Sequence, residues 1–129
     1  VRHWHTHRSV TSNVDGMGVC EMDASAVCDR VRLIADRFVA DRSQRQLRAT
    51  LDLTEMDELA AAGILTTGLP ADRQGLWHDL QHSTRGICEI YRTLAHGDPS
   101  VALASSMHPA VLALWLATPE VDATHQDAW

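Results

Sequence analysis

Histidine is the residue type whose spacing in this chain most suggests chemistry. His3, His5 and His7 alternate near the N-terminus. Alternate residues of an extended segment point to the same side, so their imidazoles could bind zinc, copper or nickel. No fourth ligand with matched spacing follows, which favours a solvated tail over a specific metal site. We therefore predict that the chain holds no metal.

A second pair, His78 and His82, has the spacing that puts two side chains on one helix face. Zinc proteases with this spacing carry a glutamate directly after the first histidine as general base. Asp79 holds that position here and no third ligand follows, so two histidines on a polar helix face are expected. His108 lies in the most apolar segment; a core or pocket histidine is favoured over an acid–base group.

Other reactive residue types are not arranged for catalysis. All eleven basic residues are arginine, so the chain offers neither a P-loop lysine nor a Schiff-base lysine. Cys20, Cys28 and Cys88 have no CxxC spacing, which favours reduced thiols in a cytoplasmic protein over a disulfide framework or a zinc ribbon. Neither a GxGxxG nor a GxSxG motif is present. We assign no catalytic residue.

Length, charge and hydropathy indicate the kind of domain that must position these residues. A chain of 129 residues favours one domain with a real core. Its net charge of −6 argues against a nucleic-acid partner, because such proteins usually present a basic face. The most apolar stretch, residues 101–117, is interrupted by Ser105, Ser106, His108 and Pro109. It falls short of the roughly 20 apolar residues of a membrane span, so we expect no membrane partner.

Hydrophobic spacing predicts an all-α bundle of about four to five helices. Residues 1–22 show no helical or alternating period and are interpreted as a flexible arm. The first helix is expected to begin at Asp23 or Ser25, because its apolar residues fall three and four apart. These residues are Val27, Val31, Ile34 and Phe38. The following run from Asp41 to Arg48 is expected to fray.

The later helices have clear boundary signals. Thr54 is the expected N-cap of a short second helix, which ends at Gly63. A long third helix is expected to begin at Leu76 or Trp77 and to close at His96 and Gly97. Asp98 then caps a fourth helix that has Pro99 at its first position. This helix is apolar nearly all round and is expected inside the bundle, with Pro109 kinking or splitting it.

The order of these segments resembles the N-terminal helical domain of the acyl-CoA dehydrogenase family, including its flavin-dependent monooxygenase relatives. The resemblance covers about residues 24–118. It rests on a helix ending in Asp41-Arg42, the stop Leu59-Ala60-Ala61-Ala62-Gly63-Ile64-Leu65, the connector Gly68-Leu69-Pro70 with Gly75, and the junction Gly97-Asp98-Pro99-Ser100 followed by His108. One departure is Leu76 directly after Gly75, where the family often has a second glycine.

The resemblance implies an FAD-dependent oxidoreductase acting on CH–CH groups of acyl thioesters, or an FMN-dependent monooxygenase. It implies residues 23–118 as the N-terminal α-domain and residues 119–129 as a link toward a β-domain absent from this sequence. The family holds its flavin mainly between the two missing domains, so we expect the isolated chain to be inactive and to bind FAD weakly. A full-length relative would be a homo-oligomer.

The same resemblance assigns a substrate pocket. In the family, the helix that matches residues 99–107 lines the deep end of the acyl-CoA pocket. The residues implied for its wall are Ala102, Leu103 and Ser106, with Met107 and His108 near its floor. Packing within the bundle remains an equally open interpretation of these residues. The alternative function is a free-standing helical interaction module that pairs through Trp77, Trp115 and the apolar fourth helix.

Overall fold

The computed structural model describes residues 23–116, and this part of the chain is helical with no strands. The predicted arm at 1–22 and link at 119–129 lie outside the described residues. Five α-helices and two short 3₁₀ turns follow one another, which confirms the all-α prediction. They are α1 (Ala24–Ala40), α2 (Arg42–Arg45), α3 (Leu53–Ala61), η1 (Ile64–Thr66), η2 (Ala71–Arg73), α4 (Leu80–Gly97) and α5 (Pro99–Leu116).

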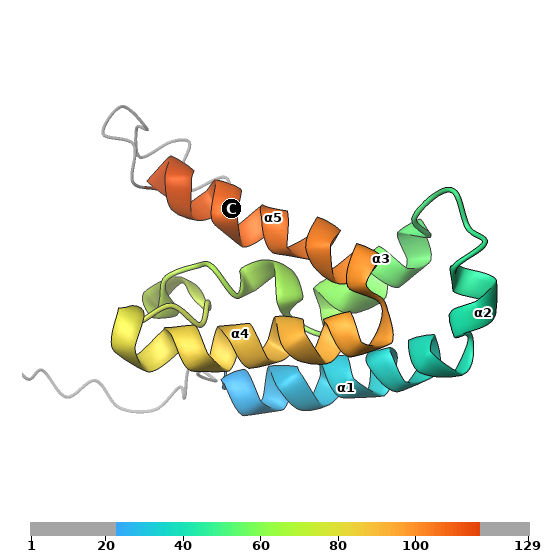
Figure 1. The fold of residues 1–129 in the computed structure, drawn as a ribbon. Coiled ribbons are helices and arrows are strands. Elements are labelled where there is room, and N and C mark those ends of the chain that lie inside the picture. The colour runs from blue at the N-terminus through green and yellow to red at the C-terminus, as the bar shows by residue number, and fades with distance from the viewer. Residues whose placement is uncertain (1–22, 117–129) are drawn as a thin grey trace, which may run out of the picture.

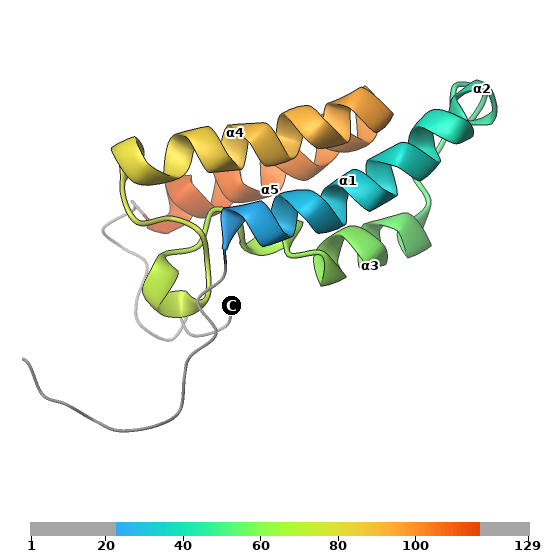
Figure 2. The same cartoon turned by 90° about the horizontal axis from the view of Figure 1, so that it is seen from below.

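The long helices pack in two layers (Figures 1 and 2). Helices α1 and α4 run side by side in the same direction, and α3 and α5 lie over them in the opposite direction. The parallel pair is tight at one end, because a Cβ on Gly97 would come within 2.7 Å of the Ala35 carbonyl oxygen. Glycine at this position therefore allows the end of α4 to approach the backbone of α1.

Helix α1 follows its sequence pattern closely. The Asp23 carboxylate accepts a 3.1 Å hydrogen bond from the Ser25 amide and caps the helix. The apolar residues spaced three and four apart are all buried, which confirms the predicted stripe. After Ala40 the chain forms the short helix α2 instead of fraying.

The N-cap of helix α3 is Asp52 and not the predicted Thr54, so the helix begins earlier than the sequence suggested. Asp52 is the N-cap, with its carboxylate 2.9 Å from the Thr54 amide, so the assignment of Thr54 as the cap was wrong. The predicted end is confirmed: Gly63 has a φ of 94°, a left-handed conformation that glycine adopts without strain. Leu59 and Ile64, on either side of that turn, are fully buried.

Helix α4 begins later than predicted. Asp79 has an extended backbone, and its carboxylate accepts a 2.8 Å bond from the His82 amide, so the helix begins at Leu80. His78 therefore precedes the helix, and the predicted shared helix face of His78 and His82 is wrong. Leu80, at the start of the helix, is 73% exposed, whereas Ile90 is fully buried.

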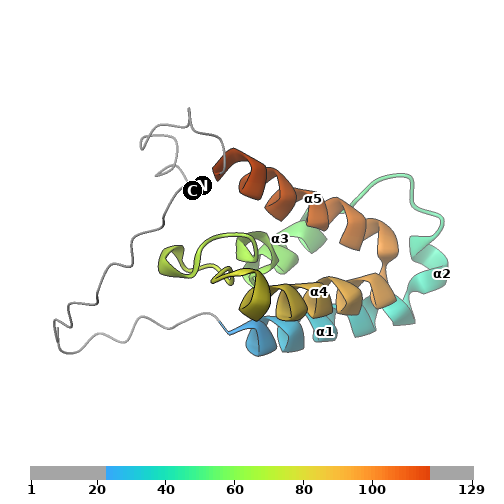
Figure 3. The same ribbon diagram turned by 60° about the vertical axis from the view of Figure 1, so that its left-hand side comes forward.

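Helix α5 begins as predicted but lies elsewhere. The Asp98 carboxylate accepts hydrogen bonds from the Ser100 and Val101 amides at 2.9 and 3.1 Å, with Pro99 at the first helical position. The helix lies at the edge of the domain, and α1 is at the opposite side (Figure 3). The expectation that α5 would sit inside the bundle is therefore wrong. Among residues 23–116, other elements cover only one side of it.

Pro109 lies inside a continuous α5 and does not split it. Its missing amide would have bonded to the Ser105 carbonyl one turn earlier. The Tyr91 hydroxyl of α4, a polar group, lies 3.5 Å from that carbonyl. Pro109 also packs on the connector, because a Cβ on Gly68 would come within 2.6 Å of the Pro109 Cβ. Tertiary contacts thus accommodate the proline.

Candidate functional site

The five residues assigned to a substrate pocket are divided between two sides of α5. Ala102 is buried in the core, whereas Leu103 and Met107 are 68% and 56% exposed. Ser106 and His108 are half-buried. The helix brings the five residues together along its length, and none of them lines the pocket at residues 42–55 and 95–101 or the pocket at residues 48–53.

The exposed side of α5 is apolar over more than two turns. Its large side chains recur at helical spacing, and we call this surface the α5 outer face, formed by Leu103, Met107, Val111 and Leu114. Each is more than half exposed. Trp115, at 37% exposure, lies at its C-terminal end. Such a surface can contact an apolar ligand or another protein segment without rearrangement of the bundle.

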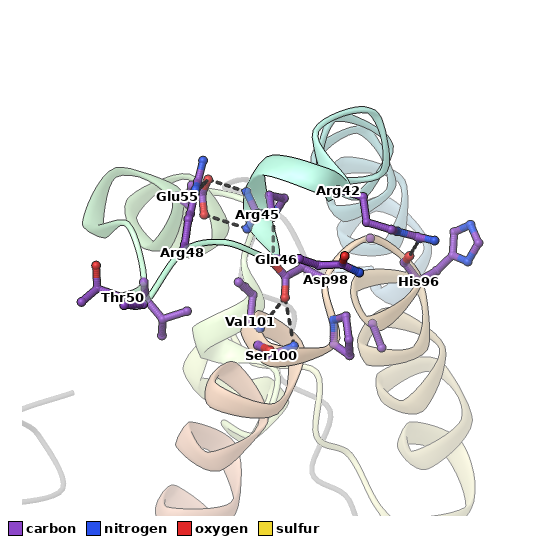
Figure 4. A pocket seen from close by; sticks show the side chains of 15 residues that line it. Arg42, Arg45, Gln46, Arg48, Thr50, Glu55, His96, Asp98, Ser100 and Val101 are labelled. Atoms are coloured by element: carbon purple, nitrogen blue, oxygen red, sulfur yellow. Dashed lines mark hydrogen bonds and ion pairs between the residues drawn. The ribbon is translucent and has the colours of Figure 1, made fainter.

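A cleft of about 600 Å³ opens at the other end of the domain. It lies where the α2–α3 loop faces the junction between α4 and α5 (Figure 4). Arginines dominate its charged lining, with polar groups from the loop and the junction. The side chains with polar groups are Arg42, Arg45, Gln46, Arg48, Thr50, Glu55, His96, Asp98 and Ser100.

Arg45 is the centre of a buried ion-pair network in this cleft. Its side chain is only 6% exposed. Two guanidinium nitrogens donate to the Glu55 carboxylate at 2.5 and 2.8 Å, and Nε donates to Asp98 at 2.8 Å. The guanidinium also lies 3.5 Å from the centre of the Phe38 ring. One side chain therefore ties together α1, α2, α3 and the start of α5.

The network changes the acidity of its carboxylates. Hydrogen bonding from Arg45 lowers the pKa of Glu55; burial opposes this shift, and Arg48, 2.6 Å away, adds to it. Burial raises the pKa of Asp98, but hydrogen bonds from the Val101 amide and Arg45 outweigh it and bring the pKa below its ordinary value. Both carboxylates are ionised at neutral pH, so this network does not supply a general acid.

A second polar cluster is buried between α4, α5 and η1. The Tyr91 hydroxyl lies 3.0 Å from the Thr67 hydroxyl, and Thr67 in turn donates to the Ile64 carbonyl at 2.8 Å. Burial raises the pKa of Tyr91, and the hydrogen bond with Thr67 opposes this. Ser105 is 2% exposed, and its hydroxyl makes no hydrogen bond. The cluster holds three elements together but contains no pair of groups poised to exchange a proton.

The remaining histidine and cysteine candidates of the sequence analysis can be placed as well. His82 is exposed and contacts the Asp79 carboxylate at 2.7 Å, while Cys28 is buried and Cys88 exposed. No group of three or more potential metal ligands occurs within residues 23–116. His3, His5 and His7 lie outside the described range. No helix in that range has the length and apolar character to cross a membrane.

Sequence reasoning missed the Arg45 network. The arginine-rich run was interpreted as a fraying helix end, because its charges show no pattern within one turn. The partners Glu55 and Asp98 are 10 and 53 residues away in the sequence. Glu55, in the first turn of α3, and Asp98, at a helix start, have local roles there, and no sequence signal pairs them with a distant arginine.

Comparison with known protein families, with curated proteins and with solved structures finds no match. The assignment of function therefore depends on the residue pattern and on the geometry described above.

Proposed function

We propose that this chain forms the N-terminal α-domain of an acyl-CoA dehydrogenase-like flavoprotein oxidoreductase. In this proposal the α5 outer face is one wall of the pocket for the acyl chain of a thioester substrate. Leu103 and Met107 contact the chain, and the remaining domains of the enzyme close the pocket. The observation that carries the proposal is the exposed apolar surface at the helix where the resemblance expects that wall.

The geometry of α5 supports this role. Leu103 and Met107 are one turn apart and both more than half exposed. The half-buried Ser106 between them uses its hydroxyl locally, donating to the Leu103 carbonyl at 2.8 Å. The face therefore offers hydrocarbon contact with no competing hydrogen-bond donor at its centre. An acyl chain needs this kind of surface, because its affinity comes from apolar area removed from water.

The α5 outer face does not fit a flavin. An isoalloxazine ring needs hydrogen-bond partners along its polar edge as well as apolar contact, and the α5 outer face presents aliphatic side chains and a thioether. The buried Ser105 hydroxyl lacks a partner, but it lies in the core, away from the outer face. FAD, or FMN in a monooxygenase, would be held by other parts of such an enzyme. No chemical step is assigned to residues 23–116.

The alternative is a helical interaction module, and the same surface favours it. An exposed apolar helix face promotes association with a partner or a second copy. Association by itself does not distinguish the two functions, since both leave α5 exposed in the isolated chain. Substrate chemistry does distinguish them.

The first experiment is the intact mass and the visible spectrum of the polypeptide purified from its own cells. The proposal predicts a mass several-fold above 14.2 kDa and the absorbance bands of a bound flavin. Anaerobic bleaching of those bands by an acyl-CoA would indicate a dehydrogenase. Insertion of an oxygen atom from O2 into a substrate, with the reduced flavin reoxidised and the second oxygen atom released as water, would indicate a monooxygenase. A colourless polypeptide near 14.2 kDa would refute both and leave the interaction module.

A substitution tests the role of α5 in that enzyme. Leu103→Trp places a larger side chain on the α5 outer face and is expected to shift preference toward shorter acyl chains, with KM for long chains rising about tenfold. Leu33→Trp is the matched control, because Leu33 is 70% exposed on α1. Equal acyl-chain preference in the two variants would show that the α5 outer face does not line the substrate pocket.

A further inference from the structure

The cleft lined by Arg42, Arg45 and Arg48, here called the arginine cleft, carries a positive charge that the protein itself does not neutralise. Three arginines and two carboxylates line it, whereas the whole chain has a net charge of −6. Arg45 and Arg48 both contact Glu55, and Arg45 also contacts Asp98. The two carboxylates therefore offset the charges of these two arginines.

Arg42 is the remaining charge. It is exposed, and its guanidinium donates to the backbone carbonyl of His96 at 2.7 Å, a neutral acceptor. No carboxylate of the described residues lies within ion-pair distance of it. Only one guanidinium nitrogen takes part in this bond, so the other N–H donors of the planar group are available for a ligand. The bond also holds Arg42 against the α4–α5 junction, so part of the ordering cost of binding is already met.

The neighbouring groups suit an oxyanion. Gln46 follows α2, on the same side of the cleft as Arg42, and Ser100 lies across from them at the start of α5 (Figure 4). Amide and hydroxyl groups donate hydrogen bonds without adding charge. A guanidinium matches the geometry of two phosphate oxygens. Leu51, 46% exposed, adds an apolar patch to the same lining.

We propose that this cleft binds a phosphate-bearing small molecule, with the phosphate on Arg42 and Gln46 and the organic part toward Leu51. The volume of about 600 Å³ is within the range of small-molecule sites and is large enough for a nucleotide. The Arg42 guanidinium supplies the local attraction for an anion that a chain of net charge −6 otherwise lacks. This site is separate from the α5 outer face, and its test does not depend on the proposed oxidoreductase function.

The test is calorimetric titration of the chain with inorganic pyrophosphate and with ADP at low ionic strength, where exposed charges are least screened. One site is expected for each probe, with ADP tighter if the apolar patch contributes. Arg42→Gln is expected to weaken binding about tenfold or more, because it removes a charge-assisted contact. Pyrophosphate binding equal to that of ADP would assign the site to a free phosphate group.

Arg85→Gln is the matched control, because Arg85 is an exposed arginine on α4 that does not line the cleft. It changes the net charge equally and is expected to leave binding unchanged. Amide NMR shifts on adding ADP should be confined to residues 42–51 and 95–101, which gives a readout independent of any variant. Absence of binding at millimolar probe, equal weakening in both variants, or shifts elsewhere would overturn the proposal.

Discussion

Removing the Arg45 side chain should destabilise the domain far more than removing an exposed arginine. Arg45→Met keeps the length of the aliphatic stem and deletes the guanidinium. The change breaks the paired bonds to Glu55, the bond to Asp98 and the contact with the Phe38 ring. These contacts join four helices, so the loss is expected to affect the whole domain.

The magnitude follows from what remains buried. Removing one partner of a buried ion pair costs about 3–5 kcal/mol, because the other charge is left without compensation. Here Glu55 keeps its contact with Arg48, and Asp98 keeps two backbone amides. The network also lies beside an open cleft, where solvent screens charge. We therefore expect the low end, about 3 kcal/mol.

The assay is urea and thermal unfolding followed by far-ultraviolet circular dichroism. A loss of about 3 kcal/mol lowers the melting temperature of a domain of this size by roughly 12–24 °C. The urea midpoint should fall with little change in slope, because the surface exposed on unfolding is nearly the same. Arg45→Lys should recover only part of the loss, since an ammonium does not make the paired contact.

Arg92→Met is the control. Arg92 also makes a two-bond contact with a carboxylate, that of Glu89, but its side chain is 73% exposed. The urea midpoint of Arg92→Met should stay close to that of the unaltered chain, because exposed ion pairs contribute little to the free energy of unfolding. Equal midpoints for Arg45→Met and Arg92→Met would refute the reasoning that burial makes the Arg45 network stabilising.

Three further predictions test other parts of the structure. The folded state lowers the pKa values of Glu55 and Asp98 from their ordinary values of 4.5 and 3.8. The two ionised carboxylates therefore stabilise the fold above those ordinary values, and this stabilisation is lost as pH falls through the folded-state pKa values. The urea midpoint should drop in acid, and it should drop less steeply in the Glu55→Gln variant. A Gly97→Ala variant should lose about 2 kcal/mol in the same assay, because its Cβ meets backbone of α1. Gly86→Ala should lose less, because its Cβ comes within 2.9 Å of a single atom, the Ala24 Cβ, and alanine favours the helix; a stable Gly97→Ala would contradict the close helix approach. Tyr91→Phe should lose about 1–2 kcal/mol by removing the hydroxyl that is hydrogen-bonded to the buried Thr67, and an unchanged midpoint would show that the hydroxyl bond is not stabilising.

Local patterns in the sequence determined the helices and most of their limits. The stripe of α1 and the Asp98-Pro99 start of α5 were predicted correctly, because an N-cap and a helix face depend on residues within four positions of one another. The left-handed turn at Gly63 is equally local. The error at Thr54 arose because two capping residues lie close together and Asp52 forms the cap. The error at His78 arose because the helix start was placed at Leu76 or Trp77, before the cap that Asp79 forms.

Only the tertiary structure decided which surfaces are covered. The apolar pattern of α5 is the same whether it lies inside a bundle or at its edge, and the contacts of α4 and η1 with one side of it placed it at the edge. The Arg45 network and the cleft around it depend on pairings across 10 and 53 residues. No local pattern encodes such distances, because the residues meet only after the helices have packed.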